Sequence, residues 1–181
     1  MLRIAIPISP EGWDEQKKEF VDPETVTVEL EHSLVSLSKW ESKWNKPFYS
    51  KIEKTTEETM DYVQCMVLTP NIDPSVFNYL TQENITEINN YIEAPMTATT
   101  FSKDQTGKNN REIITSELIY YWMISLNIPV EFQYWHLNRL LTLIRVCNVK
   151  NTPPKKMSHR EIMSRNAALN ASRKQQMNSK G

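Results

Sequence analysis

Glycine restricts the folds open to this chain more than any other residue, because it occurs at only three of 181 positions, Gly12, Gly107 and Gly181. Tight hairpins and phosphate-binding loops need glycine for positive φ angles or for close approach of the backbone. A dinucleotide-binding fingerprint, a Walker loop and a β-sandwich with many hairpins are therefore disfavoured. Few glycines together with long stretches of helical apolar spacing predict a mainly α protein.

The charge is distributed unevenly along the chain. Residues 151–181 contain seven Lys or Arg and one acid, a net charge of +6, whereas the remaining 14 basic and 21 acidic residues of 1–150 give −7. Pro153-Pro154 lies at the boundary, as prolines often do in linkers. We therefore predict an acidic body, residues 1–150, and a basic arm, residues 151–181. This division is typical of a protein that binds another molecule, and it indicates no reaction chemistry.

The body has enough apolar residues to bury a core, since 39% of the chain is hydrophobic. Arg3–Ile8 and Thr25–Glu31 alternate between apolar and polar residues, which is the pattern of half-buried strands. Turn-forming residues lie between them. We predict an N-terminal β-hairpin within residues 1–31. Its apolar face should pack on helices, because an isolated hairpin is only marginally stable in water.

After the hairpin the apolar spacing changes to that of helices. Helix-start signals recur in the next part of the body, and a long polar connection follows at residues 93–110. The signals are Ser33, the capping box of Thr55 and Glu58, Asp73-Pro74, and Thr81. The first two helices should end at Lys46-Pro47 and before Pro70.

Two longer apolar stretches, 111–126 and 130–149, are joined by a turn at 127–129. They predict an antiparallel pair of helices at the buried centre of the body, with Glu117 paired to Arg139 or Arg145. In the arm, Ser158 and Glu161 have capping-box spacing and predict a helix over His159–Gln176. The apolar face of this last helix is thin.

No pattern in the sequence points to catalysis, a metal or a cofactor. His32, His136 and His159 lack a second ligand at zinc spacing, and we expect His136 to be hydrogen-bonded in the core. Cys65 and Cys147 are expected to be free buried thiols, with a disulfide as the alternative. Cys65 would act as a nucleophile only if folding placed a base such as His136 beside it. We therefore expect a protein that is not an enzyme.

The sequence also predicts no contact with membranes. The longest apolar stretch, Leu118–Ile128, is interrupted by Ser125 and Asn127 and is shorter than the ~20 residues that span a bilayer. Met1–Pro10 is too short for a signal peptide and lacks a basic flank. We expect a soluble, intracellular protein.

Trp40 and Trp44 are candidate partner contacts. They lie one helical turn apart among Lys39, Lys43 and Lys46. Core packing of both indoles is the favoured interpretation. The alternative is one Trp in the core and one exposed anchor for a protein or a nucleic-acid base.

The basic arm supplies the other candidate contacts, Lys155, Lys156, Arg160 and Arg165. These charges can bind the acidic face of another protein, including the body of a second copy, which is the favoured interpretation. They can also neutralise nucleic-acid phosphates, or belong to a solvated tail. The acidic body would repel phosphate and makes nucleic acid the less favoured partner.

Several segments that together span nearly the whole sequence carry a resemblance to a known family: Leu30–Trp44, Lys46–Phe48, Thr55–Thr59, Ala94–Phe101, Tyr120–Met123, Trp135–Leu140 and Ser164–Ala171. On these segments the chain resembles a family of small proteins encoded by tailed bacteriophages, similar in size and character to tail assembly chaperones. No residue-level functional motif of that class transfers to this chain.

The resemblance implies a mainly helical, non-catalytic protein of the bacterial host cytoplasm. It would bind the tape-measure protein and the tail-tube protein during tail assembly and would be absent from the mature virion. Two alternatives stay open: a structural virion component such as a neck or tail connector, and a nucleic-acid-binding module that uses the arm.

Overall fold

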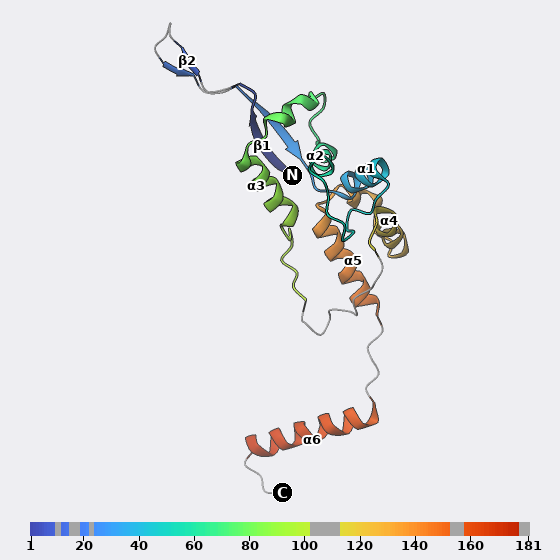
Figure 1. Ribbon diagram of the computed structural model, residues 1–181. Coiled ribbons are helices and arrows are strands. Elements are labelled where there is room, and N and C mark those ends of the chain that lie inside the picture. The colour runs from blue at the N-terminus through green and yellow to red at the C-terminus, as the bar shows by residue number, and fades with distance from the viewer. Residues whose placement is uncertain (10–11, 15–18, 22–23, 102–112, 153–157, 178–181) are drawn as a thin grey trace. The chain divides into compact units, whose positions relative to one another are not determined.

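A computed structural model describes residues 1–9, 12–14, 19–21, 24–101, 113–152 and 158–177 (Figure 1). The chain divides into two units, Met1–Val149 and Lys150–Gly181. Pro153-Pro154 lies outside the described residues. The prediction of a mainly α protein with an N-terminal β-hairpin and a C-terminal helix is confirmed.

The hairpin pairs β1 (Leu2–Pro7) with β4 (Thr25–Leu30) in antiparallel register, with Ile4 opposite Val28 and Ile6 opposite Val26. Alternate residues of both strands are buried, as the period-2 pattern predicts. Between them, β2 (Gly12–Asp14) and β3 (Glu19–Val21) form a second, shorter antiparallel pair. The sequence prediction had assigned this whole segment to a loop.

The first two helices begin where their capping residues predict. Ser33 caps α1 (Leu34–Trp44), which ends at Asn45 in the left-handed conformation, φ 52°. Thr55 and Glu58 form the predicted capping box of α2 (Thr56–Cys65). We expected α2 to continue toward Pro70, but it ends earlier. Residues 66–68 leave the helix because their backbone pairs with the free edge of β4, with Glu31 N donating to Met66 O at 2.9 Å and Leu68 N donating to Glu29 O at 2.8 Å.

The segment after α2 covers β1. Asp73 caps a 3₁₀ helix, η1 (Pro74–Tyr79), and Thr81 caps α3 (Gln82–Glu93), both where the sequence predicts a start. Both helices pack against β1, and Figure 1 shows α3 beside this strand. Asn84 Nδ2 donates to the Ala5 carbonyl at 3.2 Å, which joins α3 to the strand.

The two long helices predicted for the second half of the body differ from expectation. α4 (Ser116–Ser125) begins five residues later than predicted, because Thr115 caps it, and residues 113–115 are not helical. The stretch predicted as one helix is split into a 3₁₀ helix, η3 (Val130–Tyr134), and α5 (Leu137–Asn151). The split occurs because His136 pairs with Ser33 as an antiparallel bridge, and Leu137 N donates to His32 O at 2.7 Å.

The buried centre also differs from the prediction, because two apolar clusters share the core. One cluster joins the hairpin to α1, α2, η1 and α3, and contains Ile6, Val28 and Trp40. The other joins α1 to α4 and α5, through side chains such as Leu37, Ile119 and Leu140. Helix α1 contributes to both clusters and is the central element, whereas α4 and α5 pack on one side of it only.

The second unit contains α6 (His159–Gln176), which has the predicted bounds. Ser158 and Glu161 form its capping box, with Ser158 N donating to Glu161 Oε2 at 2.8 Å. Every residue of α6 is exposed.

Candidate functional site

Trp40 belongs to the core, which corrects its assignment as a candidate partner contact. Its side chain is 1% exposed, and its indole Nε1 donates to the Glu58 carbonyl at 2.8 Å. The ring also meets Phe48 edge to face, with centroids 5.2 Å apart. A partner could reach this ring only if the body opened.

Trp44 is half-buried and keeps part of its ring at the surface. Its indole Nε1 donates to Asp61 Oδ2 at 2.8 Å, and the Lys43 ammonium donates to the other oxygen of the same carboxylate. The Lys43 ammonium lies 5.8 Å from the centroid of the Trp44 ring. Trp44 packs against the core cluster that contains Trp40, so it is neither fully buried nor an exposed anchor.

Glu41 is a buried acid beside the pocket that the sequence analysis did not single out. It is 7% exposed, and its carboxylate accepts two backbone hydrogen bonds of 2.7 Å, from Phe48 N and from Ser116 N. It therefore ties the end of α1 to the chain that follows and to the start of α4. An acid on the apolar stripe of a predicted helix was the signal that could have revealed it, because buried carboxylates need partners.

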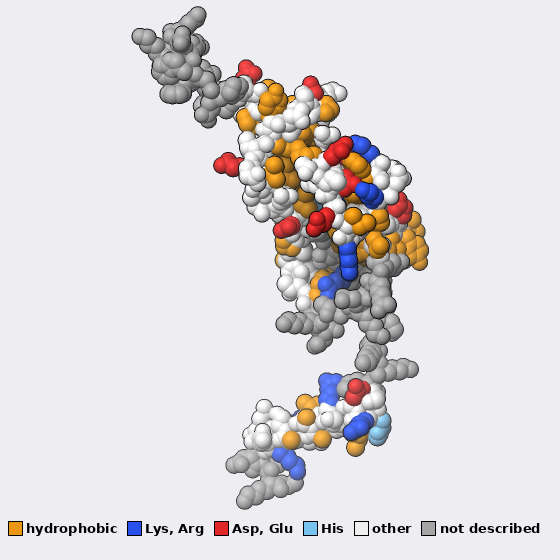
Figure 2. Space-filling model, viewed as in Figure 1, with side chains coloured by type: hydrophobic (Ala, Val, Ile, Leu, Met, Phe, Trp, Pro, Cys, Tyr) orange, Lys and Arg blue, Asp and Glu red, His pale blue; other side chains and the backbone are white. Residues whose placement is uncertain are grey.

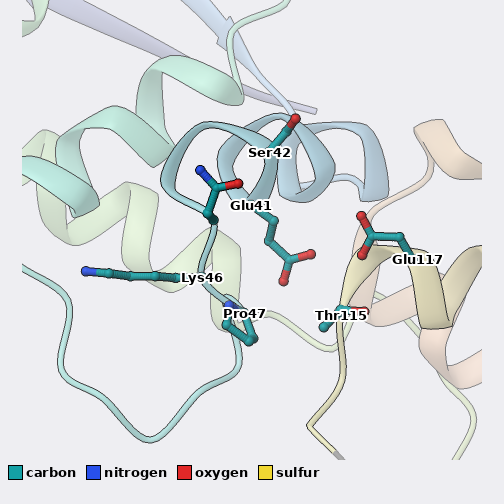
Figure 3. Close-up of a pocket in the computed structure, with 7 residues that line it drawn as sticks. Glu41, Ser42, Lys46, Pro47, Thr115 and Glu117 are labelled. Carbon is teal, nitrogen blue, oxygen red and sulfur yellow. The ribbon is translucent and has the colours of Figure 1, made fainter.

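An open pocket of about 390 Å³ lies beside Glu41, between the end of α1 and the start of α4 (Figure 3). Figure 3 shows the carboxylates of Glu41 and Glu117 facing it, whereas Lys46 extends away and bonds to Glu58. Both carboxylate oxygens of Glu41 accept hydrogen bonds from backbone N–H groups, those of Phe48 and Ser116. No set of three or more metal-ligating side chains occurs among the residues with described positions. Two carboxylates, those of Glu41 and Glu117, line the pocket, which also contains the hydroxyls of Ser42 and Thr115.

Among the described residues, no salt bridge joins Glu117 to Arg139 or Arg145 of the facing helix, and both bases contact aromatic rings. The guanidinium of Arg139 lies 4.0 Å from the centroid of the Trp135 ring, and that of Arg145 lies 3.8 Å from the centroid of the Phe101 ring. Both are cation–π contacts. Glu117 itself is exposed at the rim of the pocket.

The core holds a polar cluster built on two histidines. His32 Nδ1 lies 2.6 Å from the Tyr62 hydroxyl, and His136 Nε2 lies 2.9 Å from the Tyr91 carbonyl, to which it donates. The two imidazole centroids are 5.1 Å apart. Burial, and then the nearby His136, lower the pKa of His32 to about 3, and burial lowers the pKa of His136. The Tyr91 hydroxyl donates to Glu31 at 2.7 Å.

This cluster does not behave as an active site. His32 is 1% exposed and His136 is 7% exposed, so a substrate has no access to either ring. The expectation of a hydrogen-bonded core histidine at position 136 is confirmed, except that His136 precedes α5 instead of lying inside a helix. The contact between the two rings joins the segment after β4, which carries His32, to the segment before α5, which carries His136.

The surroundings of Cys65 do not activate its thiol. Cys65 and Cys147 are free thiols, and both are half-buried rather than fully buried as expected. Burial, and then the Asp61 carboxylate, raise the pKa of Cys65. Its sulfur lies 4.0 Å from Asp61 Oδ2. A raised pKa keeps the thiol protonated at neutral pH, which is the opposite of what an attacking cysteine needs.

The arm residues are placed as follows. Arg160 and Arg165 lie on α6 and are exposed, whereas Lys155 and Lys156 lie outside the described residues. Helix α6 also exposes apolar side chains: Ile162 at 43%, Met163 at 59%, Leu169 at 46% and Met177, its C-cap, at 80%. Basic and apolar groups thus share one exposed helix.

The body has an exposed apolar surface of its own, which we call the α4 face: Tyr121, Ile124 and Tyr134. Their exposures are 63%, 76% and 62%. The Tyr120 hydroxyl donates to Gln133 Oε1 at 2.9 Å and so ties η3, which carries Tyr134, to α4. Figure 2 shows hydrophobic side chains gathered over α4. Contiguous exposed apolar groups mark interaction sites or ligand-binding grooves.

Comparison of the chain with known protein families, curated proteins and solved structures finds no match. Within the described ranges, no helix has the length and apolar character that a membrane span requires.

Proposed function

We propose that this protein is a non-catalytic tail assembly chaperone of a tailed bacteriophage, which binds the tape-measure protein and the tail-tube protein in the host cytoplasm. The observation that carries the binding role is α6, an 18-residue helix on which every side chain is exposed. The resemblance of the sequence to small tailed-phage proteins supplies the choice of tail proteins as partners.

A helix of this kind has a physical reason to bind. Isolated helices are marginal in water, and most helices in proteins gain their stability from packing of an apolar face. Helix α6 exposes Ile162, Met163 and Leu169, and Arg160 and Arg165 can form charge-assisted hydrogen bonds with an acidic partner. Docking on a partner would bury the apolar groups and place the arginines against carboxylates.

The body supports a binding role in a second way. Its candidate site residues serve the fold: Trp40 and Glu41 join elements of the core, and His32 with His136 is inaccessible. The described surface of the body includes an acidic pocket rim and the α4 face. A chaperone needs such surfaces to shield apolar segments of a long helical partner, and it needs no reacting group.

Co-expression tests the proposal directly. The full chain, with an affinity tag, is expressed with the tape-measure protein and, separately, with the tail-tube protein of the parent phage. We expect at least one of them to co-purify. The double variant Arg160→Glu/Arg165→Glu should lose most of the co-purified protein. The matched control Lys39→Glu/Lys51→Glu makes the same change in net charge at exposed body positions and should retain it. Recovery of neither tail protein with the wild-type chain would refute the proposal.

Mass spectrometry of purified infectious particles distinguishes the chaperone from a virion component. A chaperone should be abundant in the lysate and absent from the particles. Stoichiometric presence in the particles would replace the chaperone role by a structural one, in which the arm holds a neighbouring subunit.

A further inference from the structure

We propose that the chain associates with itself, and that α6 of one copy docks on the α4 face of a second copy. The proposal concerns the chain alone and does not rest on the proposed function. In this arrangement α6 covers Tyr121 and Ile124, the large apolar side chains that α4 exposes, and the basic arm meets the acidic body.

The α4 face has a defined shape and an acidic rim. Glu117, Tyr121 and Ile124 are spaced four and three residues apart, so they lie along one side of α4. Glu131 and Tyr134 are three residues apart in the 3₁₀ helix η3, in which such side chains eclipse one another. Both acids are exposed. On α4 the surface is therefore an apolar strip next to the Glu117 carboxylate, and η3, which the Tyr120–Gln133 hydrogen bond ties to α4, adds Tyr134 and the Glu131 carboxylate.

Helix α6 carries the complementary pattern. Ile162 and Leu169 are seven residues apart and share one side of the helix, and Arg165 and Arg173 follow the same side at spacings of three and four. Ile162 and Leu169 are 43% and 46% exposed. Apolar groups on this side can cover Tyr121 and Ile124 while the arginines reach the acidic rim. Tyrosine and arginine are the residues that interfaces favour at their centres.

Charge decides which surface of the second copy occupies the α4 face. Residues 1–150 carry a net charge of −7 and residues 151–181 carry +6. Two α4 faces placed against each other would oppose Glu117 and Glu131 with the same acids, and like charges across an interface are unfavourable. The arm is the part of the chain whose charge attracts the body.

The contact joins two different surfaces, so it is heterologous. A reciprocal exchange, in which each arm docks on the other body, closes a two-fold dimer. A one-way exchange produces longer chains of copies. Both forms have a mass that rises with protein concentration above 21.2 kDa, the mass of one chain.

Sedimentation equilibrium of the full chain over a wide concentration series tests the proposal. We expect association in the wild type that weakens as salt is added. Ile124→Glu on the face and Leu169→Glu on the arm should each weaken it at least about tenfold, because burial of one aliphatic side chain is worth about one to two orders of magnitude in binding. Both positions are exposed, so neither change should disturb folding.

Matched controls introduce the same residue elsewhere. Tyr79→Glu lies on η1, which packs against β1, and Ala171→Glu lies on the side of α6 opposite Leu169. Both controls should associate as the wild type does. Equal weakening by test and control variants would show an effect of added charge alone and would overturn the assignment of the two surfaces.

A mixing experiment identifies which surfaces meet. Ile124→Glu copies keep an intact arm, and Leu169→Glu copies keep an intact α4 face, so a mixture of the two should regain one arm-to-face contact and form a species of twice 21.2 kDa. Face-to-face pairing would give no recovery. A single-chain mass for the wild type at every concentration, or no recovery in the mixture, would overturn the proposal.

Discussion

Acidification from pH 7 to pH 5 is expected to lower the free energy of unfolding by about 2 kcal/mol through His32 alone. The pKa of His32 is about 3 in the folded protein, because the ring is buried and faces His136. In the unfolded chain it returns to about 6.5. The unfolded state therefore binds one more proton between these values. The stability that the neutral ring provides is fully present above pH 6.5 and is lost as the pH falls toward 3.

The magnitude follows from linkage. Each unit of pH below the unfolded pKa costs about 1.4 kcal/mol, which gives about 2 kcal/mol by pH 5 and about 5 kcal/mol by pH 3. His136 adds loss in the same direction, because burial lowers its pKa as well. The groups around the two rings are Tyr62, Tyr91, Glu31 and the N-terminal ammonium, which bonds to Glu31. Carboxyl groups titrate mainly below this window, so the change between pH 7 and pH 5 reports the histidines.

Urea unfolding followed by tryptophan fluorescence measures the effect, since Trp40 is buried in the folded body. His32→Gln should remove most of the dependence on pH between 7 and 5, whatever it does to the stability at pH 7. His159→Gln, at an exposed position on α6, is the matched control and should leave the dependence unchanged. A wild-type stability that is constant over this window, or a His32→Gln protein with the full wild-type slope, would refute the reasoning.

Three further predictions concern the stability of the body, and urea midpoints measure each of them. Glu41→Ala should destabilise by about 2–4 kcal/mol because it removes the partner of the buried Ser116 N–H and of the part-buried Phe48 N–H, whereas Glu57→Ala, at an exposed position, should change little; a small loss for Glu41→Ala would show that water replaces the carboxylate. Thr55→Ala should cost about 1 kcal/mol by removing the cap of α2, and Thr56→Ala, one residue on, should not. Asn45→Ala should cost about 1 kcal/mol because its φ is 52°, while Asn45→Gly should be neutral, and equal effects of the two would contradict the left-handed cap.

Local signals in the sequence predicted most of the helix starts. Ser33, Thr55, Asp73, Thr81 and Ser158 each cap the element that they were expected to begin. A cap satisfies backbone N–H groups within its own first turn, so neighbouring residues contain the information. The alternation of β1 and β4 is local in the same sense. The division into an acidic body and a basic arm is a property of the sequence alone.

The predictions that were wrong, the end of α2 and a single helix over 130–149, failed because of contacts between distant segments. α2 ends early because residues 66–68 pair with β4, and the stretch 130–149 is split because His136 pairs with Ser33. Both contacts join segments that are far apart in the chain, and local spacing carries no signal for them. Trp40 could not be assigned to core or surface from its spacing either, because one face of α1 packs on the hairpin and another packs on α4 and α5.

The candidate surfaces likewise depend partly on local sequence and partly on contacts between distant elements. The opposite charges of body and arm, the caps and the strand pattern can be read from the amino acids alone, because they depend on residue type and on neighbours within a few positions. The contact of Glu41 with the start of α4, the contact of His32 with His136, and the exposure of Tyr121 and Ile124 arise from tertiary packing. Those outcomes depend on which backbone groups and apolar faces remain for distant elements to cover, and that is settled only when the elements pack together.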